Sequence, residues 1–147
     1  MREHDELCGK IRAFNRFYTV QMDFLNSHYL GTSYTTAETR VLFEVKIRGE
    51  CTQSEIARAL SIDKSYLSRI VRRFYAKGFV QKSKSGGDKR AEIISLTETG
   101  DRAAEDLIEL TNSRITAQIA ELNSRECRKL ADALDTVISI LGKDESI

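Results

Sequence analysis

The sequence contains no proline and no tryptophan, and only 8 of its 147 residues are glycine. Because proline and glycine are the strongest interrupters of helices, their scarcity permits long continuous helices. No apolar run approaches the ~18 residues that a membrane span requires. The first residues, MREHDEL, are partly acidic, which fits neither a secretory signal nor a transit peptide. We therefore expect a soluble, intracellular, cytoplasmic protein without membrane contact.

Cysteine and histidine are too sparse to suggest a disulfide framework or a metal centre. Cys8, Cys51 and Cys127 are odd in number and far apart, which implies no set of disulfides. His4 and His28 share no metal-ligand spacing with each other or with a cysteine. Glycine-rich phosphate loops, nucleophile elbows and HExxH motifs are also missing. We therefore expect neither an enzyme nor a protein that carries a cofactor.

The chain does have the composition of one globular domain with a basic central block. Hydrophobic residues make up 41% and charged residues 31% of its 147 residues, which is typical of a single domain. The formal net charge is +1, but ten basic and five acidic side chains lie within residues 51–100. A local excess of positive charge in a nearly neutral protein indicates a site for a polyanion.

Hydrophobic spacing and capping residues predict a mainly α fold with one small β-hairpin. Capping boxes at Thr35 and Thr52 each open a helix, and Asp63 is a suitable N-cap for another. The hairpin is predicted from strands at 79–82 and 91–96 around a Ser- and Gly-rich turn. The first predicted helix covers residues 7–25, where one helical stripe holds Leu7, Ile11, Phe14, Tyr18 and Leu25. The others cover the segment from Thr35 to Gly49, 52–60, 63–77, about 98–122, and a last segment capped by Ser124.

Residues 52–78 have the anatomy of a helix-turn-helix, the motif that places a recognition helix in the DNA major groove. Leu67, Ile70, Val71 and Phe74 fall on one face of the second helix. The opposite face carries small hydroxyls and arginines, which suit contacts to base edges. The candidate DNA-binding residues of the two helices are Thr52, Gln53, Ser54, Lys64, Ser65, Tyr66, Ser68, Arg69, Arg72 and Arg73.

These candidates divide into three roles. Ser65, Tyr66, Ser68 and Arg69 are expected at base edges. The residues at 52–54 begin a helix, and a helix N-terminus can bind a phosphate. Arg72 and Arg73 are expected to contact the DNA backbone. The alternative is an ordinary solvated helix face.

The predicted hairpin has the charge of a DNA-binding wing. Lys82, Lys84, Lys89 and Arg90 lie on or beside its turn, where they can reach the backbone or the minor groove. Asp88 comes two residues before Arg90, which is the minor-groove candidate, and can fix its direction by a charge-assisted hydrogen bond. The alternative is an ordinary solvated β-turn.

Four segments together resemble the MarR-type winged helix-turn-helix regulators. They are Arg69-Ile70-Val71-Arg72-Arg73-Phe74, Lys77-Gly78-Phe79-Val80, Asp88-Lys89-Arg90 and Leu96-Thr97-Glu98-Thr99-Gly100. More narrowly, residues 12–19 and 65–70 resemble the regulator half of MarR–GNAT fusion proteins, although no acetyltransferase half is present. The resemblance covers essentially the whole chain.

The resemblance implies a single MarR-type domain over residues 1–147. Its dimerisation helices would be about 5–28 and 98–142, and its winged helix-turn-helix about 35–97. It implies a homodimer that binds double-stranded DNA at a pseudo-palindrome as a sequence-specific regulator, most simply a repressor. Ser61 departs from the glycine usual in the turn. Since a left-handed serine costs roughly 1 kcal/mol, we expect a turn of different shape.

Relatives of this type respond to small aromatic acids or to oxidants, so the resemblance also implies an effector. A small aromatic or anionic ligand would find candidate pocket residues in Phe14, Phe17, Tyr18, Phe24, Tyr29 and Tyr34. The alternative for these residues is core and dimer interface. Cys8 is the candidate redox residue. The alternative function for the whole chain is a winged-helix interaction module that contacts a protein partner, or DNA without sequence choice.

Overall fold

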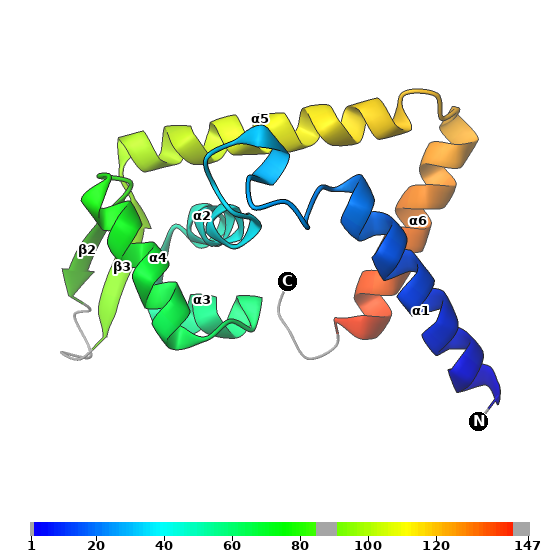
Figure 1. The fold of residues 1–147 in the computed structure, drawn as a ribbon, viewed down its shortest axis with the longest axis horizontal. Helices are drawn as coiled ribbons and strands as arrows, with labels where there is room; N and C mark the ends of the chain where they lie inside the picture. The colour runs from blue at the N-terminus through cyan, green and yellow to red at the C-terminus, as the bar shows by residue number, and fades with distance from the viewer. Residues whose placement is uncertain (1, 85–90, 143–147) are drawn as a thin grey trace. The chain divides into compact units, whose positions relative to one another are not determined.

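The computed structural model describes residues 2–84 and 91–142. The described part is mostly helical with one small antiparallel sheet (Figure 1), as the sequence predicts. It falls into two compact units, residues 1–110 and 111–147. The elements are α1 (Arg2–Gln21), η1 (Tyr29–Gly31), α2 (Thr36–Arg48), β1 (Glu50–Thr52), α3 (Gln53–Leu60), α4 (Lys64–Ala76), β2 (Val80–Lys84), β3 (Glu92–Leu96), α5 (Glu98–Ile119) and α6 (Ser124–Leu141).

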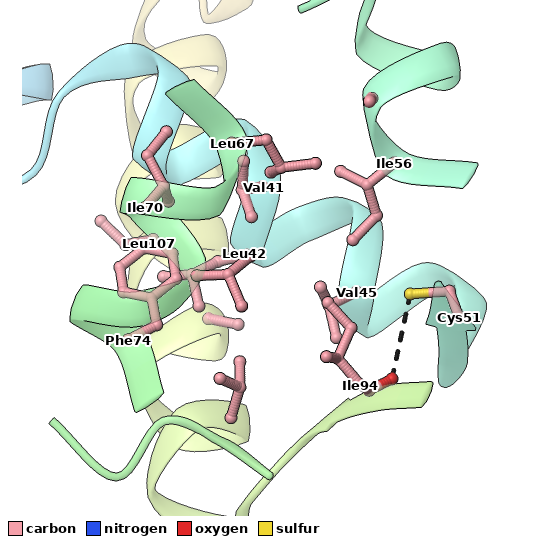
Figure 2. Close-up of a cluster of buried hydrophobic side chains, with 14 of the residues drawn as sticks. Val41, Leu42, Val45, Cys51, Ile56, Leu67, Ile70, Phe74, Ile94 and Leu107 are labelled. Atoms are coloured by element: carbon pink, nitrogen blue, oxygen red, sulfur yellow. Dashed lines mark hydrogen bonds between the residues drawn. The ribbon is translucent and has the colours of Figure 1, made fainter. Parts of the chain in front are cut away.

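The core of the first unit lies between α2, α3, α4 and the sheet. β3 is the central strand, with β1 and β2 antiparallel on either side of it. Figure 2 shows the buried side chains converging from α2, α4 and β3. The largest fully buried side chains are Phe74, Leu42, Ile56, Leu67, Ile70, Ile94, Val41, Val45 and Val71. The inward face predicted for residues 64–77 is confirmed.

Three local signals fix the helix starts in this unit. The side chain of Thr35 accepts from the Glu38 amide at 3.1 Å, and the Glu38 carboxylate accepts from the Thr35 amide at 3.2 Å. Thr52 and Glu55 form the same capping box at α3. Asp63 caps α4 through the amides of residues 65 and 66. All three caps are as the sequence predicts.

The turn between α3 and α4 keeps a left-handed residue, contrary to the expectation of a different shape. Ser61 adopts φ 50° and ψ 43°. The amide of Ile62 donates to the Ala57 carbonyl at 3.1 Å, and that of Ser61 to the Arg58 carbonyl at 3.3 Å. This pair of bonds closes a Schellman motif that usually has glycine at the left-handed position. Ser61 therefore adopts the strained left-handed conformation, and the turn between the two helices keeps its usual shape.

The first helix ends at Gln21 rather than near residue 25, where the predicted apolar stripe ends. Asp23 has φ 59°, and the amide of Phe24 donates to the Thr19 carbonyl at 3.1 Å. This is another Schellman ending, here with an aspartate at the left-handed position. The Phe24 ring packs edge-on against Tyr18 with centroids 6.1 Å apart. Leu25, which was predicted on the helical stripe, lies outside the helix.

Three smaller differences concern short or terminal segments. β1 was not predicted, because three residues are too few to show a strand period. The cap of α6 is Asn123 rather than Ser124, and its side chain accepts from the amides of Arg125 and Glu126. α5 ends at Ile119 instead of continuing to about residue 122.

The start of α5 is held against the end of α4. Thr97 donates its hydroxyl to the Gly78 carbonyl and accepts from the Gly100 amide at 3.1 Å. Its own amide donates to the Phe79 carbonyl at 2.9 Å. Gly78 has φ 75° and follows the C-cap of α4 at Lys77, close to the predicted helix end at residue 77. On the other side, Lys46 of α2 lies 2.7 Å from Asp101 of α5.

Two helices carry apolar side chains that nothing in their own unit covers. α1 has no buried residue, although Phe14 is 49% and Phe17 59% exposed. α6 likewise buries none of its residues, and Leu134 is 47% exposed. Within residues 2–84 and 91–142, no helix has both the length and the apolar character of a membrane span.

Candidate nucleic-acid interface

The outward face of α4 presents the predicted base-reading residues together. Ser65, Arg69 and Arg72 are exposed, while Tyr66 and Ser68 are half-buried between this face and the core. Lys64, at the first turn, is also exposed. α4 packs against α3, α2 and β2 (Figure 1), so its buried face fixes the direction of the outer one. This arrangement can place one helix in a major groove.

The first turn of α4 is organised by the carboxylate of Asp63. One oxygen accepts from the Ser65 amide at 2.9 Å and from the Tyr66 amide at 3.0 Å, and the Ser65 hydroxyl donates to the same oxygen. These hydrogen bonds, that of the Ser65 hydroxyl foremost, hold the pKa of the Asp63 carboxyl below its usual value. Asp63 therefore stays ionised at neutral pH and places a negative charge beside the candidate base-reading residues.

The arginines of α4 differ in their surroundings. The Arg69 guanidinium lies 5.8 Å from the centroid of the Tyr66 ring, which is a cation–π distance. Arg73 lies 3.9 Å from a carboxylate oxygen of Glu38. The Glu38 side chain is only 7% exposed, and that of Arg73 is 55% exposed. Arg73 is therefore partly engaged with α2, in addition to its predicted role at the DNA backbone.

The start of α3 carries the three residues predicted to bind a phosphate. Thr52 is the N-cap, Gln53 is half-buried and Ser54 is exposed. The capping box occupies the amides of Thr52 and Glu55, and the Glu55 carboxylate lies at the same helix end. That negative charge opposes a phosphate, so the N-terminus of α3 is a weaker anion site than its sequence suggests.

The described part of the wing carries two of the predicted basic residues. The Lys82 ammonium lies 4.8 Å from the centroid of the Tyr75 ring and 3.9 Å from a Glu92 carboxylate oxygen. Lys84 is exposed and pairs in register with Glu92. The other three predicted wing residues, Asp88, Lys89 and Arg90, lie outside the described residues.

The predicted effector residues lie partly on α1 and partly at the core. Phe14 and Tyr18 stack with centroids 5.4 Å apart on α1, where Phe17 is exposed, and Phe24 packs against Tyr18. Tyr29 is 2% exposed and belongs to the core, and Phe24 and Tyr34 pack against that core. Tyr34 also lies against Phe79, with centroids 6.4 Å apart. Burial raises the pKa of the Tyr34 phenol, and the charges of Glu38 and Asp106 raise it further.

The three cysteines are free and lie in different environments. Cys8 and Cys127 are exposed on α1 and α6. Cys51 is buried on β1, and its thiol points at the Ile94 carbonyl across a 4.0 Å hydrogen bond (Figure 2). Burial raises the pKa of the Cys51 thiol to about 11, which suppresses the thiolate that oxidation requires. No group of three or more metal-ligating side chains comes together among the described residues.

Sequence reasoning missed Glu38 and Tyr75 as neighbours of the candidate site. Glu38 was recognised as a capping residue, but its contact with Arg73 joins residues 35 positions apart and leaves no local pattern. Tyr75 lies on the exposed side of α4 and receives Lys82 from β2. Asp63 was predicted only as a helix cap. A serine two residues after an N-cap aspartate is a sequence signal that the serine hydroxyl can donate a hydrogen bond to the aspartate.

Comparison with known proteins gives a consistent result. The model of the MarR family matches residues 34–91. The multiple antibiotic resistance protein MarR of Salmonella typhimurium is 28% identical over 104 residues, which are 68% of this chain and 72% of that protein.

Solved structures give the same fold. A crystal structure of a mutant MarR from E. coli superposes with a TM-score of 0.75 at 24% identity, covering 86% of this chain and 94% of that one. The same mutant complexed with operator DNA gives a TM-score of 0.70 at 24% identity, covering 91% and 96%. At 24% identity, the structural similarity shows that the fold is shared and shows nothing further.

Proposed function

We propose that this chain is a member of the MarR family of winged helix-turn-helix transcriptional regulators, whose model it matches, and that it is a homodimeric repressor of a pseudo-palindromic DNA operator. In this proposal it is a regulator and not an enzyme. Its place of action would be the cytoplasm. The MarR–GNAT resemblance of residues 12–19 and 65–70 remains a prediction.

The observation that carries the proposal is the outer face of α4. Its exposed hydroxyl and guanidinium groups stand on a helix whose other face is locked into the core. Ser65, Tyr66, Ser68 and Arg69 would contact base edges, because they occupy the first turns of a helix that can enter the major groove. Arg72 and the wing lysines would contact phosphates and set the orientation of the protein.

The uncovered apolar faces of α1 and α6 support the homodimer. A second copy of the chain would bury side chains such as Phe14 and Phe17 on α1 and Leu134 on α6. A symmetric pair would present two α4 helices to half-sites about one helical turn apart. In this proposal residues 1–147 form one MarR-type domain. Its dimerisation helices lie within about 5–28 and 98–142, and its winged helix-turn-helix lies within 35–97.

The test is selection of bound duplexes from a random DNA pool at near-physiological salt, since low salt inflates non-specific binding. We expect enrichment of an inverted repeat. Arg69→Ala should then lose discrimination between sites, whereas Lys82→Ala should weaken binding to all DNA alike. Arg102→Ala, an exposed residue on α5 paired with Glu98, is the matched control for loss of one positive charge.

Two results would contradict the proposal. Salt-sensitive binding without enrichment of any sequence would favour the alternative, a winged-helix module that binds DNA without sequence choice or binds a protein partner. Equal losses for Arg69→Ala and Lys82→Ala on every duplex would show that the division between base and phosphate contacts is wrong.

Release of the operator by a small aromatic or anionic ligand, or by an oxidant, belongs to the same proposal. The stacked rings of Phe14 and Tyr18 offer an aromatic surface, and Cys8 is an accessible thiol. Operator affinity should therefore fall on addition of a small aromatic acid or of peroxide. Unchanged affinity with peroxide in the wild type would eliminate the redox route.

A further inference from the structure

In the first turn of α4, the hydroxyl proton of Ser65 is already used in a hydrogen bond within the protein. The Ser65 side chain donates to the Asp63 carboxylate, which accepts from two backbone amides as well. A serine hydroxyl has one proton and two lone pairs. With the proton directed at Asp63, the outer side of the Ser65 oxygen offers lone pairs alone.

The bond to Asp63 is strong enough to hold the proton there. A hydrogen bond to an ionised carboxylate is roughly twice as strong as one between neutral groups. Asp63 cannot be the donor, because its carboxyl is ionised at neutral pH. Turning the Ser65 proton toward a base would break this bond and leave the carboxylate with one donor fewer.

From this geometry we infer that Ser65 is a specificity-determining residue that accepts a hydrogen bond from the exocyclic amino group of adenine or cytosine. This inference rests on the proposed function and adds a rule for one position of each half-site. In the major groove adenine N6 and cytosine N4 are donors, whereas guanine O6 and N7 and thymine O4 are acceptors. An acceptor-only oxygen therefore favours adenine or cytosine on the strand it faces, and disfavours guanine or thymine.

Selection from a random DNA pool with four proteins tests the inference. They are the wild type, Ser65→Ala, Asp63→Gly and Asp63→Asn. At one position of each half-site the wild type should prefer adenine or cytosine by about 2- to 10-fold, the factor that one net hydrogen bond gives. Ser65→Ala should lose the preference at that position and at no other.

The two Asp63 variants separate the captured proton from the cap and the charge. Asp63→Gly costs only a few tenths of a kcal/mol as an N-cap and frees the Ser65 proton, so guanine and thymine should become acceptable at that position. Asp63→Asn keeps a side-chain oxygen for the hydroxyl and the amides, so the preference should remain. Both also remove a negative charge, which should add the same gain in affinity for every sequence to any change at that position.

A base analogue gives an independent measurement on the selected duplex. Replacing the preferred base by an analogue without the exocyclic amino group should weaken the wild type by the same 2- to 10-fold, and leave Ser65→Ala unaffected. A wild-type preference for guanine or thymine at the position, or identical selection profiles for wild type and Ser65→Ala, would overturn the inference alone. Failure of the wild type to enrich any sequence would overturn the proposed function together with it.

Discussion

At the residue scale, the position of Gly100, three residues after Thr97, leaves no room for a side chain. A Cβ on Gly100 would lie 1.9 Å from the carbonyl oxygen of Phe79 and 2.7 Å from its carbonyl carbon. The contact is with backbone, which cannot swing aside as a side-chain end could. The same Phe79 carbonyl accepts from the Thr97 amide. The close approach therefore belongs to the corner that joins α4, β2 and α5.

Gly100→Ala should destabilise the fold by about 3 kcal/mol, because the added methyl must displace backbone in a packed corner. This corresponds to a fall in Tm of about 10 °C for a chain of this size. Gly9→Ala is the matched control, since nothing lies within 4 Å of its Cβ and alanine favours helix. Thermal melts followed by circular dichroism measure both. An unchanged Tm for Gly100→Ala would mean that the corner opens without cost.

At the scale of elements, α4 is tied to α2 through Arg73 and Glu38. The Glu38 carboxylate closes the capping box of α2 and is nearly buried, so its negative charge has little access to water. Arg73 lies 3.9 Å away on α4. A buried carboxylate without its cation is costly, although the half-exposed arginine and the long distance reduce the energy. The pair therefore links the position of α4 to the start of α2.

Arg73→Ala should lower the free energy of unfolding by about 1 kcal/mol, because it leaves the Glu38 charge uncompensated. Arg72→Ala, the exposed neighbour, should weaken DNA binding and leave Tm unchanged. In a Glu38→Gln background the capping box is retained, and Arg73→Ala should then cost almost nothing. Urea unfolding of the single and double variants measures the coupling. Equal costs of Arg73→Ala in both backgrounds would exclude the interaction.

At the scale of the whole molecule, the apolar faces of α1 and α6 are surfaces that a single chain leaves exposed to water. Neither helix buries a side chain within its own unit. On α6 the exposed residues Leu130, Leu134, Val137, Ile138 and Leu141 follow a near-heptad spacing, which is the pattern of a helix that packs against other helices. A second copy is the partner that the proposed function supplies.

Leu134→Lys should convert the proposed dimer to a monomer, because it places a charge in the centre of the α6 apolar face. Sedimentation velocity measures the change directly. The affinity for a duplex with both half-sites should fall about 100-fold or more, since the two α4 helices no longer bind as a linked pair. Asp132→Lys, on the opposite side of α6, should remain dimeric. A wild-type protein that sediments as a monomer at micromolar concentration would contradict the prediction.

Features set by neighbours in the chain were predictable from the sequence. The capping boxes at Thr35 and Thr52, the Asp63 cap and the Gly78 ending follow from bonds between residues two to five positions apart. The inward and outward faces of α4 follow from helical periodicity alone. The same local logic failed where Asp23 takes a left-handed conformation at the end of α1, at the short strand β1, at the cap of α6 and at the end of α5.

The contacts between distant residues were decided by the tertiary structure. Arg73 meets Glu38, Lys82 meets Tyr75, and Gly100 meets the Phe79 backbone only because α2, α4, β2 and α5 converge on one core. Tyr29 belongs to that core, and Phe24 and Tyr34 pack against it. Sequence alone determined which helices form and which face of α4 is polar, because both depend on short-range periodicity. Which arginine faces a carboxylate and which remains on the open face depends on packing between elements, and no local pattern encodes it.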